Sequence, residues 1–238
     1  MKQRGFAQGI FATSATAKET PGTKRIGQSG KCYRYTKNGA TELAAGVFVV
    51  SIALHANQKE LPILQAEAIG TRNLTLTITA AGTVLAENDL RGGEFMINTG
   101  TGSGHSYEIE SSTAVTAAST TISISLARGL VVALDTTSEF ILVRNPFVGA
   151  IVSTTLTLPL LGITPNVIPA NHYFWVQRTG LAAGYEDDTG MTTGEPFQQS
   201  NADAGRLEVA AAHTIRKLGT CILSTADNEW APVWMEME

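Results

Sequence analysis

Short runs in which apolar residues alternate with threonine or serine recur along most of the chain. In "NLTLTI" (residues 73–78) Leu74, Leu76 and Ile78 alternate with polar residues, and "TISISL" (121–126) repeats the pattern. A period of two places successive side chains on opposite faces, which is typical of half-buried antiparallel strands. Further runs of strand length are "GVFVVSIAL", "GEFMIN", "HSYEIESS", "SEFILVRNPF", "GAIVSTTLTLPLLGI", "RLEVAAA", "KLGTCILS" and "APVWMEM".

Turn residues separate these runs at intervals of about 8–12 residues, the spacing of all-β sandwiches and barrels. The chain shows neither an amphipathic helix pattern nor a repeat of solenoid or propeller length. We therefore expect an all-β fold with a body over residues 41–238, built as an antiparallel β-sandwich or barrel. A sub-boundary near residue 159 stays open, and residues 182–200 are interpreted as a loop.

The first 30 residues show no hydrophobic period and are rich in Gly, Ser, Thr and Lys. The segment "ETPGTKRIGQSG" consists of turn-forming residues throughout. A segment this polar buries little of its own surface, so it becomes ordered only against another surface. We predict that residues 1–40 form an extended N-terminal arm.

The balance of basic and acidic residues changes near the end of this arm. Residues 1–37 hold eight basic residues and one acidic residue, whereas the remainder holds nine basic and twenty acidic residues. A basic arm on an acidic body favours an acidic partner: nucleic acid, an acidic protein surface or a sister subunit. We favour a protein partner, because the basic residues are thinly spread and the acidic body repels nucleic acid. The arm residues assigned to partner binding are Lys2, Arg4, Phe6, Phe11, Lys18, Lys24, Arg25, Lys31, Arg34 and Lys37.

Three aromatic residues stand side by side in "NHYFWVQRTG" (residues 171–180). On a strand, Tyr173 and Trp175 share one face while Phe174 and Arg178 share the other. Both faces carry apolar residues, so we expect this strand to be covered on both sides, either by core packing or by a subunit interface. A stacking platform for a sugar or base is the third alternative, since stacking requires exposed rings.

The residues that usually carry chemistry form no recognisable arrangement. Cys32 and Cys221 lack a CxxC or zinc spacing and are expected to be free thiols. The four histidines are scattered, and the acidic "GYEDDTG" is interpreted as a solvated loop, with a calcium site as the alternative. The Gly-rich "NTGTGSGHS" lacks the Lys and helix of a phosphate loop, which favours a hairpin loop. We therefore predict no enzyme activity, cofactor, metal or membrane span.

Several of these motifs resemble virion proteins of tailed bacteriophages, at the level of head decoration or cement proteins. The resemblance rests on the Gly turn after "GGEFMIN", then "YEI", "TISISL", "LVRNPFVG", "YFWVQ" and "APVW", and it covers residues 91–238. A weaker match includes "IGQSGKCYRY" in the arm. These are strand and turn motifs, and none of them is a site motif that transfers a residue role.

The resemblance implies a structural protein on the exterior of the phage capsid, made in the host cytoplasm. Such proteins bridge and stabilise subunits of the major capsid protein, and many are homotrimers with arms across the shell. The implied partners are the major capsid protein and further copies of this chain, as a trimer or a dimer. The alternative function is a carbohydrate- or host-recognising β-domain on a virion surface, with Trp175, Trp230 and Trp234 as stacking candidates.

Overall fold

The computed structural model describes residues 5–27, 29–53, 58–78, 84–187, 190–210 and 216–237. These residues contain strands and turns and no α-helix, and the strand pairs are antiparallel with one exception. The all-β prediction is therefore confirmed. Lys2, Arg4, His55 and Asp188 lie outside the described residues.

The chain forms two compact units, which we call the body unit and the inserted unit. The body unit combines Met1–Ile52 with Pro146–Glu238, and the inserted unit is Ala53–Asn145. The two connections leave the body side by side, because Val50 and Ile151 exchange backbone hydrogen bonds of 2.9 and 3.0 Å. This division replaces the sequence-based boundaries at residues 40 and 159. The insertion escaped notice because its strands have the same period and composition as those of the body.

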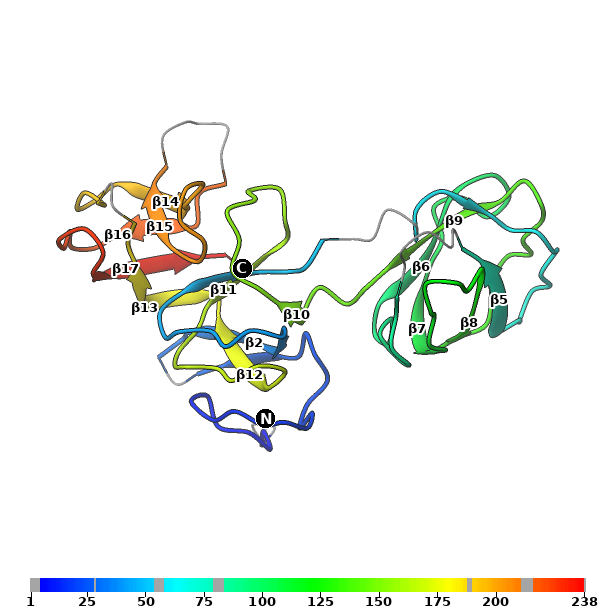
Figure 1. Ribbon diagram of the computed structural model, residues 1–238, viewed down its shortest axis with the longest axis horizontal. Helices are drawn as coiled ribbons and strands as arrows, with labels where there is room; N and C mark the ends of the chain where they lie inside the picture. Colours follow the sequence, from blue (N-terminus) through cyan, green and yellow to red (C-terminus); the bar gives the residue numbers. More distant parts are fainter. Residues whose placement is uncertain are drawn as a thin grey trace. The chain divides into compact units, whose positions relative to one another are not determined.

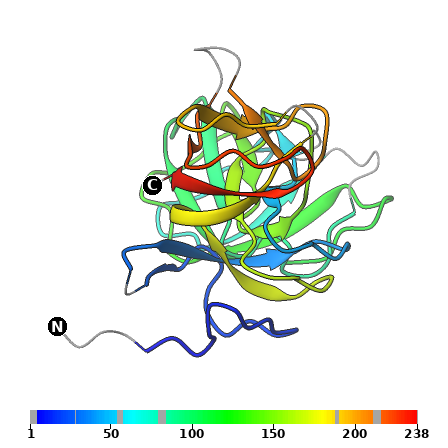
Figure 2. The same ribbon diagram turned by 90° about the vertical axis from the view of Figure 1, so that its left-hand side faces the viewer.

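The body unit contains two sheets (Figure 1). The first has the order β1 (Lys24–Ile26), β2 (Cys32–Asn38), β12 (Tyr173–Gln177), β11 (Leu160–Ile163) and β3 (Phe48–Val50), and β10 (Val148–Ala150) pairs with β2 in parallel. The second has the order β13 (Thr179–Tyr185), β17 (Trp230–Glu236), β16 (Gly219–Cys221), β14 (Pro196–Gln199) and β15 (Leu207–Val209). Figure 2 shows β13 and β17 lying side by side.

The two body sheets share a hydrophobic core. Phe48 and Ile163 of the first sheet pack with Phe197, Val233 and Met235 of the second. Each of these side chains alternates along its strand with a residue that faces the other way. The body is therefore sandwich-like, as its period-2 pattern predicted.

The inserted unit is one six-stranded sheet that curls into a nearly closed barrel. Its order is β4 (Leu61–Pro62), β9 (Glu139–Val143), β6 (Glu94–Thr99), β7 (Ser106–Ser112), β8 (Thr121–Leu126) and β5 (Asn73–Thr77). The predicted alternation is confirmed, because Leu74, Leu76, Ile122 and Ile124 point into the core while the intervening Thr and Ser residues face outward.

Two local predictions were wrong. Residues 182–200 were interpreted as a loop, yet β13 extends to Tyr185 and β14 begins at Pro196. The Gly and Ala residues of β13 hid its strand character, since they are weak strand formers. Conversely, residues 152–159 form a loop between β10 and β11, although Leu156 and Leu158 alternate like strand residues.

Candidate functional site

The N-terminal segment runs beside β2 and β12 of the first body sheet (Figure 1) and packs there against an aromatic cluster. Tyr35 and Trp175 are paired across β2 and β12 and have no exposed surface. Phe6 meets the indole of Trp175 edge-on, with ring centroids 5.2 Å apart, and Ile10 packs against the same cluster. The described part of the arm is therefore folded onto its own body unit.

Gln8 holds this segment in place by both donating and accepting hydrogen bonds, and only 4% of its surface is exposed. Its amide Nε2 donates to the carbonyls of Ala12 (2.7 Å) and Tyr173 (2.9 Å), and its Oε1 accepts from the Tyr35 hydroxyl (2.6 Å). The Gln8 carbonyl accepts from the Trp175 indole N–H at 3.1 Å. Burial raises the pKa of Tyr35 above its usual range.

Several of the basic residues assigned to partner binding contact aromatic rings in the body unit. The Arg25 guanidinium lies 5.0 Å from the centroid of Phe6 and 5.5 Å from that of Trp175, and it donates to the Gln8 carbonyl at 2.7 Å. Lys37 Nζ lies 5.7 Å from the centroid of the Tyr173 ring. These residues therefore help to hold the aromatic cluster.

The remaining arm residues differ in exposure. Lys18, Lys24 and Phe11 are exposed, with Phe11 at 71% the most open of the large apolar side chains. Lys31 and Arg34 are partly buried, and Arg34 donates to the Gly22 carbonyl at 2.9 Å. The structure thus brings Phe6 and Arg25 together at Trp175 and leaves Phe11 in solvent.

The aromatic run of β12 is covered on both faces, as its pattern predicted. Trp175 faces the N-terminal segment, while Phe174 and Val176 lie in a separate cluster on the other side of the sheet. Phe174 and Trp175 are fully buried, and Tyr173 is partly buried against Tyr35, with ring centroids 5.8 Å apart. Within this unit the run is core, which removes Trp175 from the stacking candidates.

Arg178 has a structural position in the body unit. Its guanidinium donates to the carbonyls of Leu160 (3.0 Å), Leu161 (2.9 Å) and Met237 (3.0 Å). These carbonyls belong to β11 and to the residue that follows β17. Arg178 therefore ties the two body sheets together.

An apolar surface lies on the outward side of the second body sheet, and we call it the apolar face. Leu181 pairs with Trp234 across β13 and β17, and Tyr185 pairs with Trp230. Leu181, Trp230 and Trp234 remain about half exposed, at 45%, 51% and 47%. The other members of the face are Ala183, Pro232, Thr220 and Ile222. None of its residues is charged.

A stack of side chains fixes one end of the apolar face. The rings of Tyr185 and Trp230 are nearly parallel with centroids 4.6 Å apart, and the Arg206 guanidinium lies 4.5 Å from the centroid of Tyr185. The Trp230 indole N–H donates to the carbonyl of Ala45 at 3.1 Å. One side of the Trp230 ring is therefore occupied, although the residue is half exposed.

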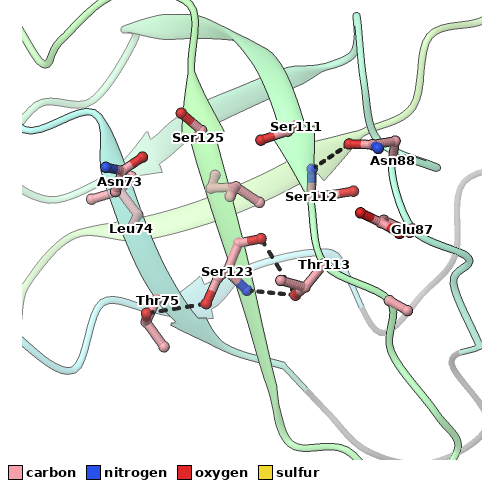
Figure 3. Close-up of a pocket in the computed structure, with 12 residues that line it drawn as sticks. Asn73, Leu74, Thr75, Glu87, Asn88, Ser111, Ser112, Thr113, Ser123 and Ser125 are labelled. Carbon is pink, nitrogen blue, oxygen red and sulfur yellow. Dashed lines mark hydrogen bonds between the residues drawn. The ribbon is translucent and has the colours of Figure 1, made fainter.

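The inserted unit carries a polar hollow of about 500 Å³ on its outer surface, which we call the hydroxyl groove (Figure 3). Its floor is the outward side of β5, β8 and the end of β7, and the segment around Glu87 and Asn88 forms a wall. The lining residues are Asn73, Leu74, Thr75, Glu87, Asn88, Ser111, Ser112, Thr113, Ala114, Ser123, Ile124 and Ser125, of which Leu74 and Ile124 point their side chains into the core.

The other sequence candidates occupy structural positions. Cys32 and Cys221 are buried free thiols, as predicted, and burial raises the pKa of Cys221. The Gly-rich stretch forms the turn between β6 and β7, which confirms a hairpin loop. Glu186 is buried, which contradicts the solvated loop, and it accepts from the backbone N–H of Met191 and the hydroxyl of Thr225.

The described residues contain no group of three or more His, Cys, Asp or Glu side chains suited to a metal ion. They also contain no helix long and apolar enough to cross a membrane.

Sequence reasoning found Trp230 and Trp234 but missed Leu181, Ile222 and the hydroxyl groove. The two tryptophans are four residues apart, which places them on one face of a strand, and this spacing was the available signal for the apolar face. The serines and threonines of the groove alternate with buried residues, so they were interpreted only as outward-facing positions. Comparison with known proteins gives no match to any family model, curated protein or solved structure.

Proposed function

We propose that this chain is a structural virion protein, a decoration protein that binds the outer surface of a phage capsid and stabilises its subunits. In this proposal it acts by binding protein surfaces rather than by catalysis. The observation that carries the proposal is the apolar face, because exposed apolar patches of this kind mark protein-binding surfaces. The resemblance of its strand and turn motifs to head decoration proteins supports the same assignment.

The apolar face supplies part of the free energy that a stable contact requires. A tryptophan side chain buries about 150–250 Å², so the two half-exposed indoles alone leave about 200 Å² in water. At about 25 cal/mol per Å², covering them contributes about 5 kcal/mol before the cost of association is subtracted. Trp and Tyr are also the residues that dominate the energetics of protein interfaces.

A second copy of the chain is the occupant that we propose for the apolar face. Interfaces between identical subunits are more apolar than transient ones, and their centres are depleted in charge. The apolar face fits this description because its central residues on β13, β17 and β16 carry no charge, whereas the exposed Glu236 on β17 and Arg206 beside Tyr185 lie at its ends. In this proposal the exposed basic residue Lys18 faces the acidic exterior of the capsid.

A double substitution tests this proposal. L181S/W234S removes a cross-strand pair from the apolar face, and L64S/V131S replaces two exposed apolar residues of the inserted unit as a control. Sedimentation velocity and co-sedimentation with undecorated phage heads would be measured for both. We expect only L181S/W234S to lower the oligomeric state and weaken head binding. Equal behaviour of the two variants would contradict the proposal.

A further inference from the structure

The hydroxyl groove of the inserted unit has the dimensions and chemistry of a ligand site. Its volume of about 500 Å³ lies within the range of about 300–1,000 Å³ typical of small-molecule sites. Nine of its twelve lining residues are Ser, Thr, Asn or Glu, and Glu87 alone carries a charge. The inserted unit as a whole has nine acidic and five basic residues. This balance disfavours nucleic acid and other anions as ligands.

The polar side chains form two rows across three strands (Figure 3). In the first row, Asn73 pairs with Ser125, and Ser125 pairs with Ser111 on the next strand. In the second row, Thr75 lies beside Ser123, with 3.3 Å between their hydroxyl oxygens, and the Ser123 N–H donates to the Thr113 hydroxyl at 3.1 Å. The strands that carry these rows stand about 4.8 Å apart, the usual spacing of strands in a sheet.

The two rows differ in how far their hydrogen-bonding capacity is used. The second row is bonded internally, so it forms an ordered floor. The side chains of Asn73, Ser111 and Ser125 in the first row make no hydrogen bond within the described part of the chain. Each of them can both donate and accept, which is the requirement for binding a ligand that does the same.

Two hydrogen bonds between Asn88 and Ser112 hold the wall beside the first row in place. The Asn88 N–H donates to the Ser112 carbonyl at 2.9 Å, and the Ser112 N–H donates to the Asn88 side-chain oxygen at 3.3 Å. Asn88 adopts a positive φ of 63° there. Its side-chain oxygen is thereby used, which leaves the amide NH₂ as a donor, and the exposed Glu87 carboxylate next to it is an acceptor.

We propose that the hydroxyl groove binds a neutral glycan. Sugars present many hydroxyl groups that donate and accept, which matches the mixed donors and acceptors of the first row and the wall. The groove has no aromatic ring on which a sugar could stack, so each site binds weakly. Display in many copies on one particle raises the avidity of such a site without new contacts. The gain in avidity rests on the proposed function, whereas binding by the groove itself does not, because the groove lies on a different unit from the apolar face.

The test uses the full chain and a panel of neutral oligosaccharides built from glucose, galactose or N-acetylglucosamine. Binding would be measured by ligand-observed NMR, since we expect dissociation constants of about 1 mM. N73A/S125A removes one cross-strand pair from the first row. T77A/T121A removes the next exposed pair on the same two strands, outside the groove, and serves as the matched control.

We expect at least one neutral oligosaccharide to bind, with its dissociation constant raised about tenfold or more by N73A/S125A and unchanged by T77A/T121A. L181S/W234S, on the body unit, is expected to leave this binding intact, which separates the groove from the apolar face. No binding by the wild type, or an equal loss in N73A/S125A and T77A/T121A, would overturn the proposal.

Discussion

Replacing Phe6 by alanine removes the ring that packs edge-on against Trp175 and lies under the Arg25 guanidinium. An edge-to-face aromatic pair contributes about 0.5–1.5 kcal/mol beyond burial, and a cation–π contact about 0.5–1 kcal/mol. Burial of the partly exposed ring adds about 1 kcal/mol. We therefore expect F6A to destabilise the docked N-terminal segment by about 2–4 kcal/mol. Because this segment covers Trp175, its release would bring water to the indole.

F11A provides the matched control, since Phe11 lies on the same segment but is 71% exposed. In a W230F/W234F background Trp175 is the sole tryptophan, so its fluorescence reports on this site alone. We expect acrylamide to quench Trp175 more strongly in F6A than in F11A, and urea unfolding to show the larger loss of stability in F6A. Indistinguishable quenching and stability in the two variants would refute a docked N-terminal segment.

Three further changes probe the two units. R178K leaves one ammonium for three carbonyls and should lower stability to urea by about 2–3 kcal/mol, whereas R216K, at an exposed position, should be nearly neutral. G100A sets a Cβ against the backbone oxygen of Thr137 at a φ of 75° and should cost on the order of 3 kcal/mol or more in thermal unfolding. G104A, also at a positive φ but in open space, should cost about 1–2 kcal/mol, and equal losses would argue against this loop geometry. Hydrogen bonds from two threonine hydroxyls lower the pKa of Asp135 below its usual 3.8. The ionised Asp135 therefore stabilises the folded state above pH 3.8, and this stabilisation is lost as the pH falls through the native pKa. D135N should therefore melt earlier than the wild type at neutral pH and equally at pH values below the native pKa.

The strands of the inserted unit were predictable because each has one buried face. Leu74, Leu76, Ile122 and Ile124 alternate with Thr and Ser, and a one-residue slip would expose all of them. The loop between β6 and β7 was equally predictable from its glycines. The insertion itself was not, because a chain leaves a sheet and returns to it without any local change in composition.

The position of the N-terminal segment depends on contacts that the local sequence does not reveal. Phe6 and Gln8 stand in a Gly- and Ala-rich stretch without a hydrophobic period, yet they complete a cluster whose other members, Tyr35 and Trp175, are distant in sequence. The segment is too polar to bury itself, as predicted, and the surface that orders its described part belongs to its own chain. The hydroxyl groove was missed for a related reason, since outward-facing Ser and Thr form a site only when three strands and a wall meet.

Co-sedimentation with expanded phage heads that lack their decoration protein tests the central claim most directly. The heads would come from the phage that, under the proposed function, encodes this chain, and the purified protein would be added at low and at moderate salt. We expect saturable binding at a fixed ratio to the major capsid protein, weakened by salt to the extent that basic residues contribute. Absence of saturable binding at both salt concentrations would contradict the assignment as a capsid decoration protein.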